Sequence, residues 1–173
     1  MKTFLIAAIT ADGFIAKNSA HMPSWTSKED KKFFVERTKQ AGVVIMGSKT
    51  FEVMGRPLKD RLNIVYSRDP NKKYEGAEVT NKPPAELLRD LEARGFHEAA
   101  ICGGSNIYTM FLKAGLLDTL YITIEPLLFG SGVTILNEPV EAHLKLVSSK
   151  MLSDNVVLLE YGCLNQRTNT KKN

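Results

Sequence analysis

The chain has few of the residues that build disulfide frameworks and metal sites. Its 173 residues include two cysteines, Cys102 in an apolar run and Cys163 near the end, which lack the number and spacing of a disulfide framework or a metal clip. The three histidines, at positions 21, 97 and 143, form no i, i+4 pair, so no metal site is predicted. This cysteine usage fits a reducing cytoplasm.

Long apolar runs and a strongly one-sided charge are also missing. The first apolar stretch, residues 4–9, is too short to span a membrane and has no cleavage pattern. The net charge is +4, and the basic residues of the chain are scattered except in the tail, 165–173. We expect this tail to be disordered and solvated rather than to bind nucleic acid. No Pro-, Gly- or Ser-rich stretch divides the chain, so we expect one domain over 1–164.

Apolar runs alternate with helical patterns along most of the chain. Strands are predicted near residues 4–9, 43–46, 62–66, 99–102 and 119–125, and a hairpin over 144–150 and 156–161. Helices are predicted from the N-cap candidates Thr26 and Ser27 to about Gln40, over 84–94, and in shorter stretches around Phe51 and Ile107. The prediction is a three-layer α/β fold with a mixed, mostly parallel central sheet, helices on both faces and an antiparallel C-terminal hairpin.

The segment from Val43 to Arg68 indicates an anion site. An apolar run ends at Gly47 and passes into Ser48-Lys49-Thr50 at the head of a helical pattern, so backbone N–H groups and a lysine converge there. A second run ends at Ser67-Arg68, and together these strand ends would suit a phosphate. Taken singly, each charge is also typical of a solvated loop, because Lys and Arg are mostly exposed.

Asp30 can be interpreted in two ways. It shares a helix face with Phe33 and Phe34, which would desolvate the carboxyl and raise its pKa toward neutrality, as a proton-managing group requires. Its spacing from Ser27 also fits a capping box, in which a first-turn acid only serves the helix end.

Gly103-Gly104 and Cys102 can each be interpreted in two ways as well. Paired glycines at the end of a strand let a ligand approach the backbone, although without the GxGxxG spacing they also fit a plain tight turn. Cys102 is interpreted as a core residue rather than a nucleophile, since no histidine lies close to it in the sequence. The polar segment 17–23, which Trp25 closes, is long enough to form a lid.

Several of these stretches together resemble dihydrofolate reductase. The resemblance is carried by LIAAITADGFIA, WTSKEDKKFF, VIMGSKTFEVMGRPLKDRLNIVYSR, ICGGSNIYTMFL and LYIT, in that order from about Phe4 to Thr123. The later PLLFGSGVTIL and VVLLEY, with DGFIA, are more similar to the reductase domain of riboflavin biosynthesis, which belongs to the same fold superfamily. The resemblance implies an NADPH-dependent reductase of dihydrofolate, with a phosphoribosylated aminouracil as the alternative substrate.

The resemblance also assigns roles residue by residue. Asp30 would promote protonation of the pterin, Thr123 would share its hydrogen-bond network, and Arg61 would clamp the glutamate carboxylate of folate. Ser67 and Arg68 would bind the 2′-phosphate of NADPH, and Gly103-Gly104 would form a cis peptide beside the nicotinamide. The implied substrate-binding positions are Ile6, Ala8, Lys31, Phe34, Met54, Leu58, Arg61, Cys102 and Tyr108. The implied cofactor-binding positions are Ala8, Ile15, Ala16, Ser48, Lys49, Thr50, Ser67, Arg68, Gly103, Gly104, Ser105, Asn106 and Ile107.

Three positions depart from the family pattern. Ala16 stands where a glycine is common, and the longer lid leaves open whether His21 or Met22 closes on the nicotinamide. Lys31 takes a place that is usually apolar, where it would reach a substrate carboxylate or phosphate, or simply extend into solvent. A non-catalytic NADPH-binding module is the third function considered, although a pure binder has no need of Asp30 and Thr123.

Overall fold

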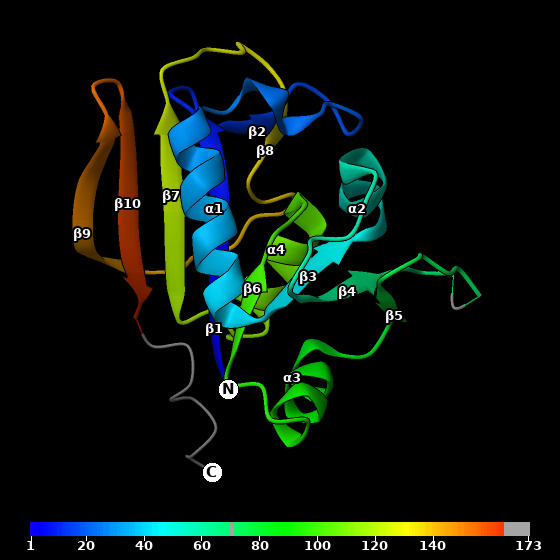
Figure 1. Cartoon of the computed structure of the whole chain (residues 1–173). Coiled ribbons are helices and arrows are strands. Elements are labelled where there is room, and N and C mark those ends of the chain that lie inside the picture. The colour runs from blue at the N-terminus through cyan, green and yellow to red at the C-terminus, as the bar shows by residue number, and fades with distance from the viewer. Residues whose placement is uncertain (70, 165–173) are drawn as a thin grey trace.

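The structure is a computed structural model that describes residues 1–69 and 71–164 (Figure 1). The tail predicted at 165–173 lies outside the described residues. The elements, in chain order, are β1 (Lys2–Thr10), β2 (Phe14–Ala16), the 3-10 turn η1 (Pro23–Trp25), α1 (Lys28–Ala41), β3 (Val43–Gly47), α2 (Ser48–Met54), β4 (Leu62–Tyr66), β5 (Glu78–Thr80), α3 (Pro84–Ala93), β6 (Glu98–Ile101), α4 (Ser105–Lys113), β7 (Thr119–Glu125), β8 (Val133–Thr134), β9 (Leu144–Ser153) and β10 (Val156–Cys163).

One eight-stranded sheet organises the described part of the chain. Its strand order is β5-β4-β3-β6-β1-β7-β10-β9, and β2 pairs separately with β8. The pairings from β5 to β7 are parallel, whereas β10 pairs antiparallel with both β7 and β9. The predicted fold class is therefore confirmed, including the C-terminal hairpin.

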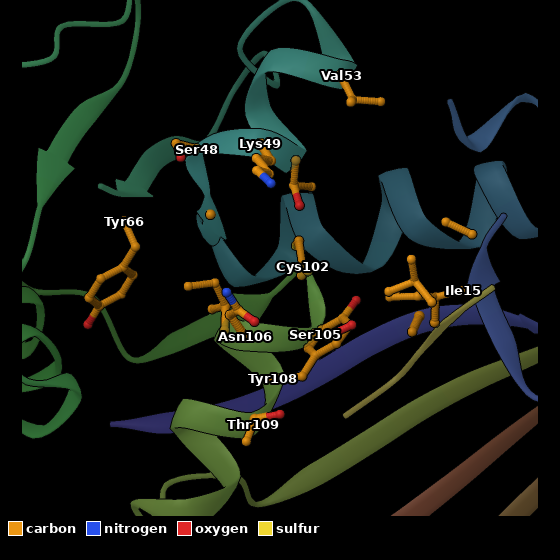
Figure 2. Close-up of a pocket in the computed structure, with 18 of the residues that line it drawn as sticks. Ile15, Ser48, Lys49, Val53, Tyr66, Cys102, Ser105, Asn106, Tyr108 and Thr109 are labelled. Carbon is orange, nitrogen blue, oxygen red and sulfur yellow. The ribbon is translucent and has the colours of Figure 1, made fainter. Parts of the chain in front are cut away.

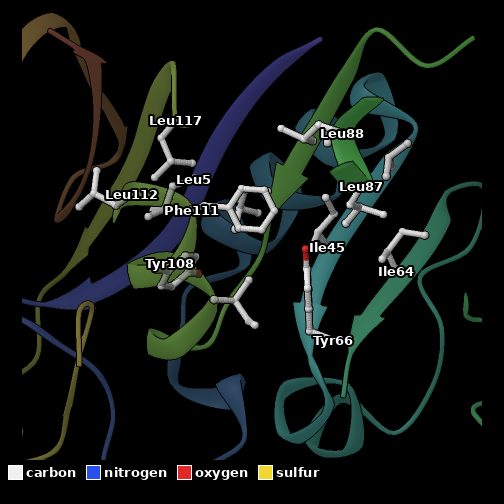
Figure 3. Packing of buried hydrophobic residues seen from close by; sticks show 14 of the residues in the cluster. Leu5, Ile45, Ile64, Tyr66, Leu87, Leu88, Tyr108, Phe111, Leu112 and Leu117 are labelled. Atoms are coloured by element: carbon white, nitrogen blue, oxygen red, sulfur yellow. The ribbon is translucent and has the colours of Figure 1, made fainter. Parts of the chain in front are cut away.

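The central strands are buried on both faces, which explains their continuous apolar runs. Successive residues of β1 belong to different cores: Phe4 packs in a cluster with Phe51 and residues of α1, whereas Leu5 packs in a cluster with Phe111 of α4 and Leu91 of α3. Figure 3 shows the second cluster, where Phe111 lies between α4 and the sheet. Helices α1 and α2 thus cover one face, and α3 and α4 cover the other.

The helix ends follow from local sequence. Ser27 caps α1 by accepting a hydrogen bond from the backbone N–H of Asp30 at 3.1 Å, and Gly42 ends it at φ 73°, the left-handed conformation that glycine adopts readily. Helix α2 begins directly after β3, and α4 begins shortly after β6. The parallel strands therefore deliver two helix starts to one edge of the sheet, the usual place for a ligand site in such folds. Within residues 1–69 and 71–164, no helix is long and apolar enough to cross a membrane.

Candidate active site

A cavity of about 1540 Å³ opens along the carboxyl edge of the parallel strands. Its wall contains the ends of β1, β3, β4 and β6, the first residues of α2 and α4, and part of α1. Figure 2 shows Ser48 and Lys49 at the start of α2 on one side, Ser105 and Asn106 at the start of α4 on the other, and Cys102 between them.

Most of the predicted site residues meet in this cavity. Those that line it are Ile6, Ala8, Ile15, Ala16, Asp30, Lys31, Phe34, Ser48, Lys49, Thr50, Met54, Leu58, Ser67, Arg68, Cys102, Gly103, Gly104, Ser105, Asn106, Ile107 and Tyr108. The structure does not place Thr123 or Arg61 in the wall. Thr123 lies directly behind it, hydrogen-bonded to Asp30, whereas Arg61 contacts the C-terminal half of α1.

Asp30 combines the two interpretations that the sequence left open. Its backbone N–H serves the helix cap, but its carboxyl lines the cavity and is only 8% exposed. Burial raises the pKa of this carboxyl, and the negative charge of Glu125 adds to the effect. Hydrogen bonds with the hydroxyls of Thr123 and Thr26 and the positive charge of Lys31 oppose it. The net result is a carboxyl whose pKa lies above its ordinary value, inside a cavity large enough for a ligand.

Glu125, at the end of β7, closes the capping arrangement around Ser27. Its Oε1 accepts hydrogen bonds from both the backbone N–H and the hydroxyl of Ser27, each at 2.8 Å. In a capping box the acid three residues after the cap would take this backbone N–H. Because Glu125 takes it instead, the Asp30 carboxylate is not required there.

The half of the cavity next to Asp30 has apolar walls. Ile6, Ala7 and Ala8 of β1 form one side, and Phe34, Met54 and Leu58 come from α1, α2 and the loop after it. Such a slot suits a flat aromatic ring system, with Asp30 as its one acidic group. Apolar walls around a few placed polar groups are typical of small-molecule sites.

The other half of the cavity has the polar groups of the predicted anion site. Ser48, Lys49 and Thr50 begin α2, and Ser67 and Arg68 follow β4, which pairs in register with β3. The Ser67 hydroxyl is buried and accepts a hydrogen bond from the Asp69 N–H at 3.1 Å, while Arg68 is exposed. Two strand ends thus present a lysine and an arginine to one cavity, an arrangement suited to the phosphates of a dinucleotide.

Gly103 and Gly104 lie between these two halves. The peptide bond that joins them is cis, as the resemblance implied, and Gly103 has φ 106°. A Cβ at Gly103 would lie 3.1 Å from the Tyr108 hydroxyl, and one at Gly104 would lie 3.4 Å from Thr50 Oγ1. The absence of side chains at the two glycines therefore lets Tyr108 and Thr50 pack against this backbone, which itself lines the cavity.

Tyr108 and Cys102 stand beside the glycine pair. The Tyr108 hydroxyl donates to the carbonyl of Ile6 at 2.8 Å and so fixes α4 to β1. Burial raises the pKa of the Cys102 thiol to about 12, so the thiol stays protonated near neutral pH. This agrees with the interpretation of Cys102 as a core residue and not a nucleophile, although the residue is half-buried and packs against the core from the cavity wall.

The lid segment covers one side of the cavity. His21 lines the cavity, whereas Met22 is 54% exposed and is not in the wall. The rings of His21 and Trp25 both pack edge-on against Phe129, with centroids 5.6 and 5.1 Å away. His21, and not Met22, is therefore the residue that the lid turns inward.

Lys31 and Arg61 are both held by the chain itself. The Lys31 ammonium donates to the carbonyls of Thr26 at 2.9 Å and Ser24 at 3.3 Å, so it ties the turn that follows the lid segment to α1. The Arg61 guanidinium donates through Nη1 to Thr38 Oγ1 at 2.7 Å and through Nε to the Lys59 carbonyl at 2.9 Å.

Sequence reasoning missed Glu125, Asn63 and Phe129. Asn63 is 2% exposed. Its side chain accepts a hydrogen bond from the Leu58 N–H and donates to the carbonyls of Leu58 and Arg61. Asn63 therefore shapes the loop that contains Leu58 and Arg61. The alternation of β7 did hold a signal for Glu125, because it lies two residues after Thr123 and so on the same face of the strand. Asn63 and Phe129 gave no comparable signal.

Comparisons with known proteins agree with this geometry. The dihydrofolate reductase family model matches residues 2–155. Dihydrofolate reductase type 3 from Salmonella typhimurium is 39% identical over 121 residues, which are 69% of this chain and 68% of that protein. The structure of dihydrofolate reductase from Enterococcus faecalis, complexed with NADP(H) and RAB-propyl, matches with a TM-score of 0.78 and 27% identity, covering 95% of this chain and 97% of that one.

A phosphoribosylaminouracil reductase shares the fold. The diaminohydroxyphosphoribosylaminopyrimidine deaminase/5-amino-6-(5-phosphoribosylamino)uracil reductase from Thermotoga maritima matches with a TM-score of 0.75 and 19% identity, over 94% of this chain and 56% of that one. At that identity the likeness concerns the fold alone. The match of the family model and the identity to the Salmonella protein decide the assignment: the chain belongs to the dihydrofolate reductase family.

Proposed function

We propose that this protein reduces 7,8-dihydrofolate to 5,6,7,8-tetrahydrofolate with NADPH. Membership of the family makes it an NADPH-dependent oxidoreductase, and the substrate is the part proposed here. The observation that carries the proposal is the placement of Asp30. It is a buried carboxyl at the end of an apolar slot, with a raised pKa and with Thr123 beside it.

Different residues of the cavity would bind the cofactor and the substrate. Lys49, Thr50, Ser67 and Arg68 would hold the phosphates of the cofactor, and Gly103-Gly104 would receive its nicotinamide. When bound, NADPH supplies the hydride. Binding both ligands in one cavity positions donor and acceptor in advance, which lowers the entropic part of the barrier.

Asp30 has two roles in this proposal. Its carboxyl would bind the amino and ring N–H groups of the pterin, and it would promote protonation of the ring nitrogen next to the carbon that accepts the hydride. A raised pKa keeps the proton available nearer to neutral pH. The apolar walls from Ile6, Phe34 and Met54 would exclude water from the pterin while it is reduced.

The alternative substrate is 5-amino-6-(5-phosphoribosylamino)uracil. The sequence DGFIA and the C-terminal third favour it, as does Lys31 in the cavity wall. In that case Lys31 and Arg61 would bind the ribose phosphate, whereas with folate Arg61 would bind a carboxylate. The apolar slot formed by Phe34, Met54 and Leu58 favours the benzoyl group of folate over a phosphorylated ribose.

One assay separates these functions. Purified protein is mixed with NADPH, and cofactor oxidation is followed after addition of dihydrofolate or of the aminouracil ribotide. We expect oxidation with dihydrofolate only. Turnover with the ribotide alone would show that the aminouracil ribotide is the substrate instead. Turnover with neither compound would favour a non-catalytic NADPH-binding module. The free thiols of Cys102 and Cys163 fit a reducing compartment, and we propose the cytoplasm.

A further inference from the structure

We propose that Glu125 is a positioning residue for Asp30: it holds the amino end of α1 so that the Asp30 carboxyl faces the cavity, and its charge favours the protonated form of that carboxyl. The proposal rests on the proposed function for its effect on catalysis. The arrangement of the two acids is a property of the chain itself.

The first observation is where the two buried acids lie. Among the described residues, Asp30 and Glu125 are the acidic side chains that are buried, at 8% and 2% exposure. They come from different elements, α1 and β7, and Figure 1 shows the start of α1 beside the carboxyl end of β7. Two buried carboxyls at one place are costly unless one is protonated or both are hydrogen-bonded.

The second observation is the bonded route between the two acids. Ser27 gives both its backbone N–H and its hydroxyl proton to Glu125 Oε1. Since that proton is used, the Ser27 oxygen accepts from the N–H of Asp30 at 3.1 Å. Glu125 therefore fixes the rotamer of the cap residue, and the cap fixes the turn that carries Asp30. The route joins residues 98 positions apart, so it sets where α1 starts relative to the sheet.

The third observation is the charge around Asp30. The charged and titratable groups that interact electrostatically with it include Glu125 from β7, Lys31 from its own helix and Tyr108 from α4. The Tyr108 phenol is neutral, because burial raises its pKa well above the ordinary value, and the Lys31 ammonium donates to two backbone carbonyls. Among these groups, Glu125 is the one that adds a negative charge near Asp30, from the same strand face as Thr123.

The test compares two substitutions that make the same chemical change. In Glu125→Gln the charge is lost, but the amide oxygen can still accept both bonds from Ser27. Glu160→Gln, on β10, is the matched control, since Glu160 also accepts a bond from a serine hydroxyl, that of Ser148 at 3.0 Å. The side-chain carboxyl carbons of ligand-free, 13C-labelled protein are titrated by NMR, with Asp30 assigned by its loss in Asp30→Asn.

We expect Glu125→Gln to lower the titration midpoint of Asp30 and Glu160→Gln to leave it in place. We also expect Glu125→Gln to lower kcat for dihydrofolate several-fold at pH 7–8, with its pH profile moved to lower pH. An Asp30 midpoint that is the same in Glu125→Gln and wild type would overturn the proposal. Because the titration needs no substrate, a wild-type protein without dihydrofolate activity would defeat the proposed function alone.

A second variant keeps the test open if Glu125→Gln does not fold. Glu125→Asp retains the charge but is one methylene too short to keep both bonds to Ser27. We expect the Asp30 midpoint to stay raised while kcat falls several-fold and amide exchange at the start of α1 increases. Unchanged kcat and unchanged exchange in Glu125→Asp would contradict the positioning role.

Discussion

The Arg61 guanidinium donates a hydrogen bond to the hydroxyl of Thr38 at 2.7 Å. This bond joins the loop before β4 to the last turns of α1. A second bond, from Nε to the Lys59 carbonyl, fixes the plane of the group. A guanidinium has five N–H groups. The two bonds to the chain therefore orient the group and leave other N–H donors able to bind a ligand. Arg61 is thus a preoriented cation outside the cavity wall, connected through the Asn63 side chain to Leu58, which lines the apolar half of the cavity.

Replacing Arg61 should therefore affect the substrate and not the cofactor. We expect Arg61→Ala to raise KM for dihydrofolate by about 10–100-fold, since a charged hydrogen bond contributes about 1.5–3 kcal/mol, with kcat little changed. Fluorescence titration should show an unaltered Kd for NADPH. Arg56→Ala removes an exposed arginine of the same region and is the control. An equal rise in KM for both variants would argue against a carboxylate contact at Arg61.

Asp30→Asn should depress turnover in a pH-dependent manner. An asparagine keeps the shape of the side chain but cannot supply a proton, so we expect kcat at pH 7 to fall by about 10²–10⁴-fold. The deficit should shrink in acid, where solvent protonates the substrate without help. Steady-state kinetics from pH 5 to 9 would measure this, and an unaltered rate at neutral pH would remove Asp30 from the mechanism.

The same substitution should stabilise the folded protein at neutral pH. The pKa of Asp30 in the folded state is raised above its ordinary value of 3.8, so the folded state favours the neutral form. That preference is fully present below pH 3.8 and is lost as the pH rises through the folded pKa, where the buried group becomes charged. Asn at this position never becomes charged, so the Tm of Asp30→Asn minus that of wild type should grow between pH 4 and pH 8. A difference independent of pH would contradict the burial argument.

Arg68 should determine the choice between NADPH and NADH. If its guanidinium binds the 2′-phosphate, Arg68→Ala loses a charge-assisted contact worth about 1.5–3 kcal/mol, which corresponds to about a 10–100-fold rise in Kd for NADPH. The Kd for NADH, which lacks that phosphate, should not change. Isothermal titration with both cofactors makes the comparison within one protein, and equal losses for the two would indicate a merely structural role.

The elements that the sequence predicted well are those whose pattern is local. The periodicity of residues 119–125 gave β7 with its observed bounds. For α1, the N-cap candidate Ser27 is the observed cap, and the predicted end at about Gln40 is one residue short of the observed Ala41. The short strands β2, β5 and β8 were not predicted, because two or three residues are too few to show alternation. Their pairing is decided by what lies opposite them in the fold.

The candidate site divides in the same way. Lys49, Asp30 and Gly103, which all line the cavity, could be predicted as candidates because each sits at a strand or helix end that the sequence marks. The bonds of Glu125 to Ser27 and of Arg61 to Thr38 join residues that no local pattern connects. That His21 and not Met22 lines the cavity could not be predicted either, because the His21 ring packs against Phe129, which is more than a hundred positions away in the sequence.

Phe129 should control how firmly the lid is held. Its ring contacts those of His21 and Trp25, and the Lys17 ammonium lies 5.3 Å from its centroid. Its backbone N–H and that of Gly130 donate to the Asp12 carboxylate, at 3.0 and 2.7 Å, so the loop should keep its place when the ring is removed.

Since each aromatic pair contributes about 0.5–1.5 kcal/mol, Phe129→Ala should speed amide hydrogen exchange in residues 17–25 by about tenfold. Exchange in β1 and β7 should not change, because their hydrogen bonds lie within the sheet. Leu128→Ala is the matched control, as Leu128 is 74% exposed and adjoins Phe129 in the same loop. Equal exchange in the two variants would mean that the backbone bonds to Asp12, and not the aromatic ring, hold the lid over the cavity.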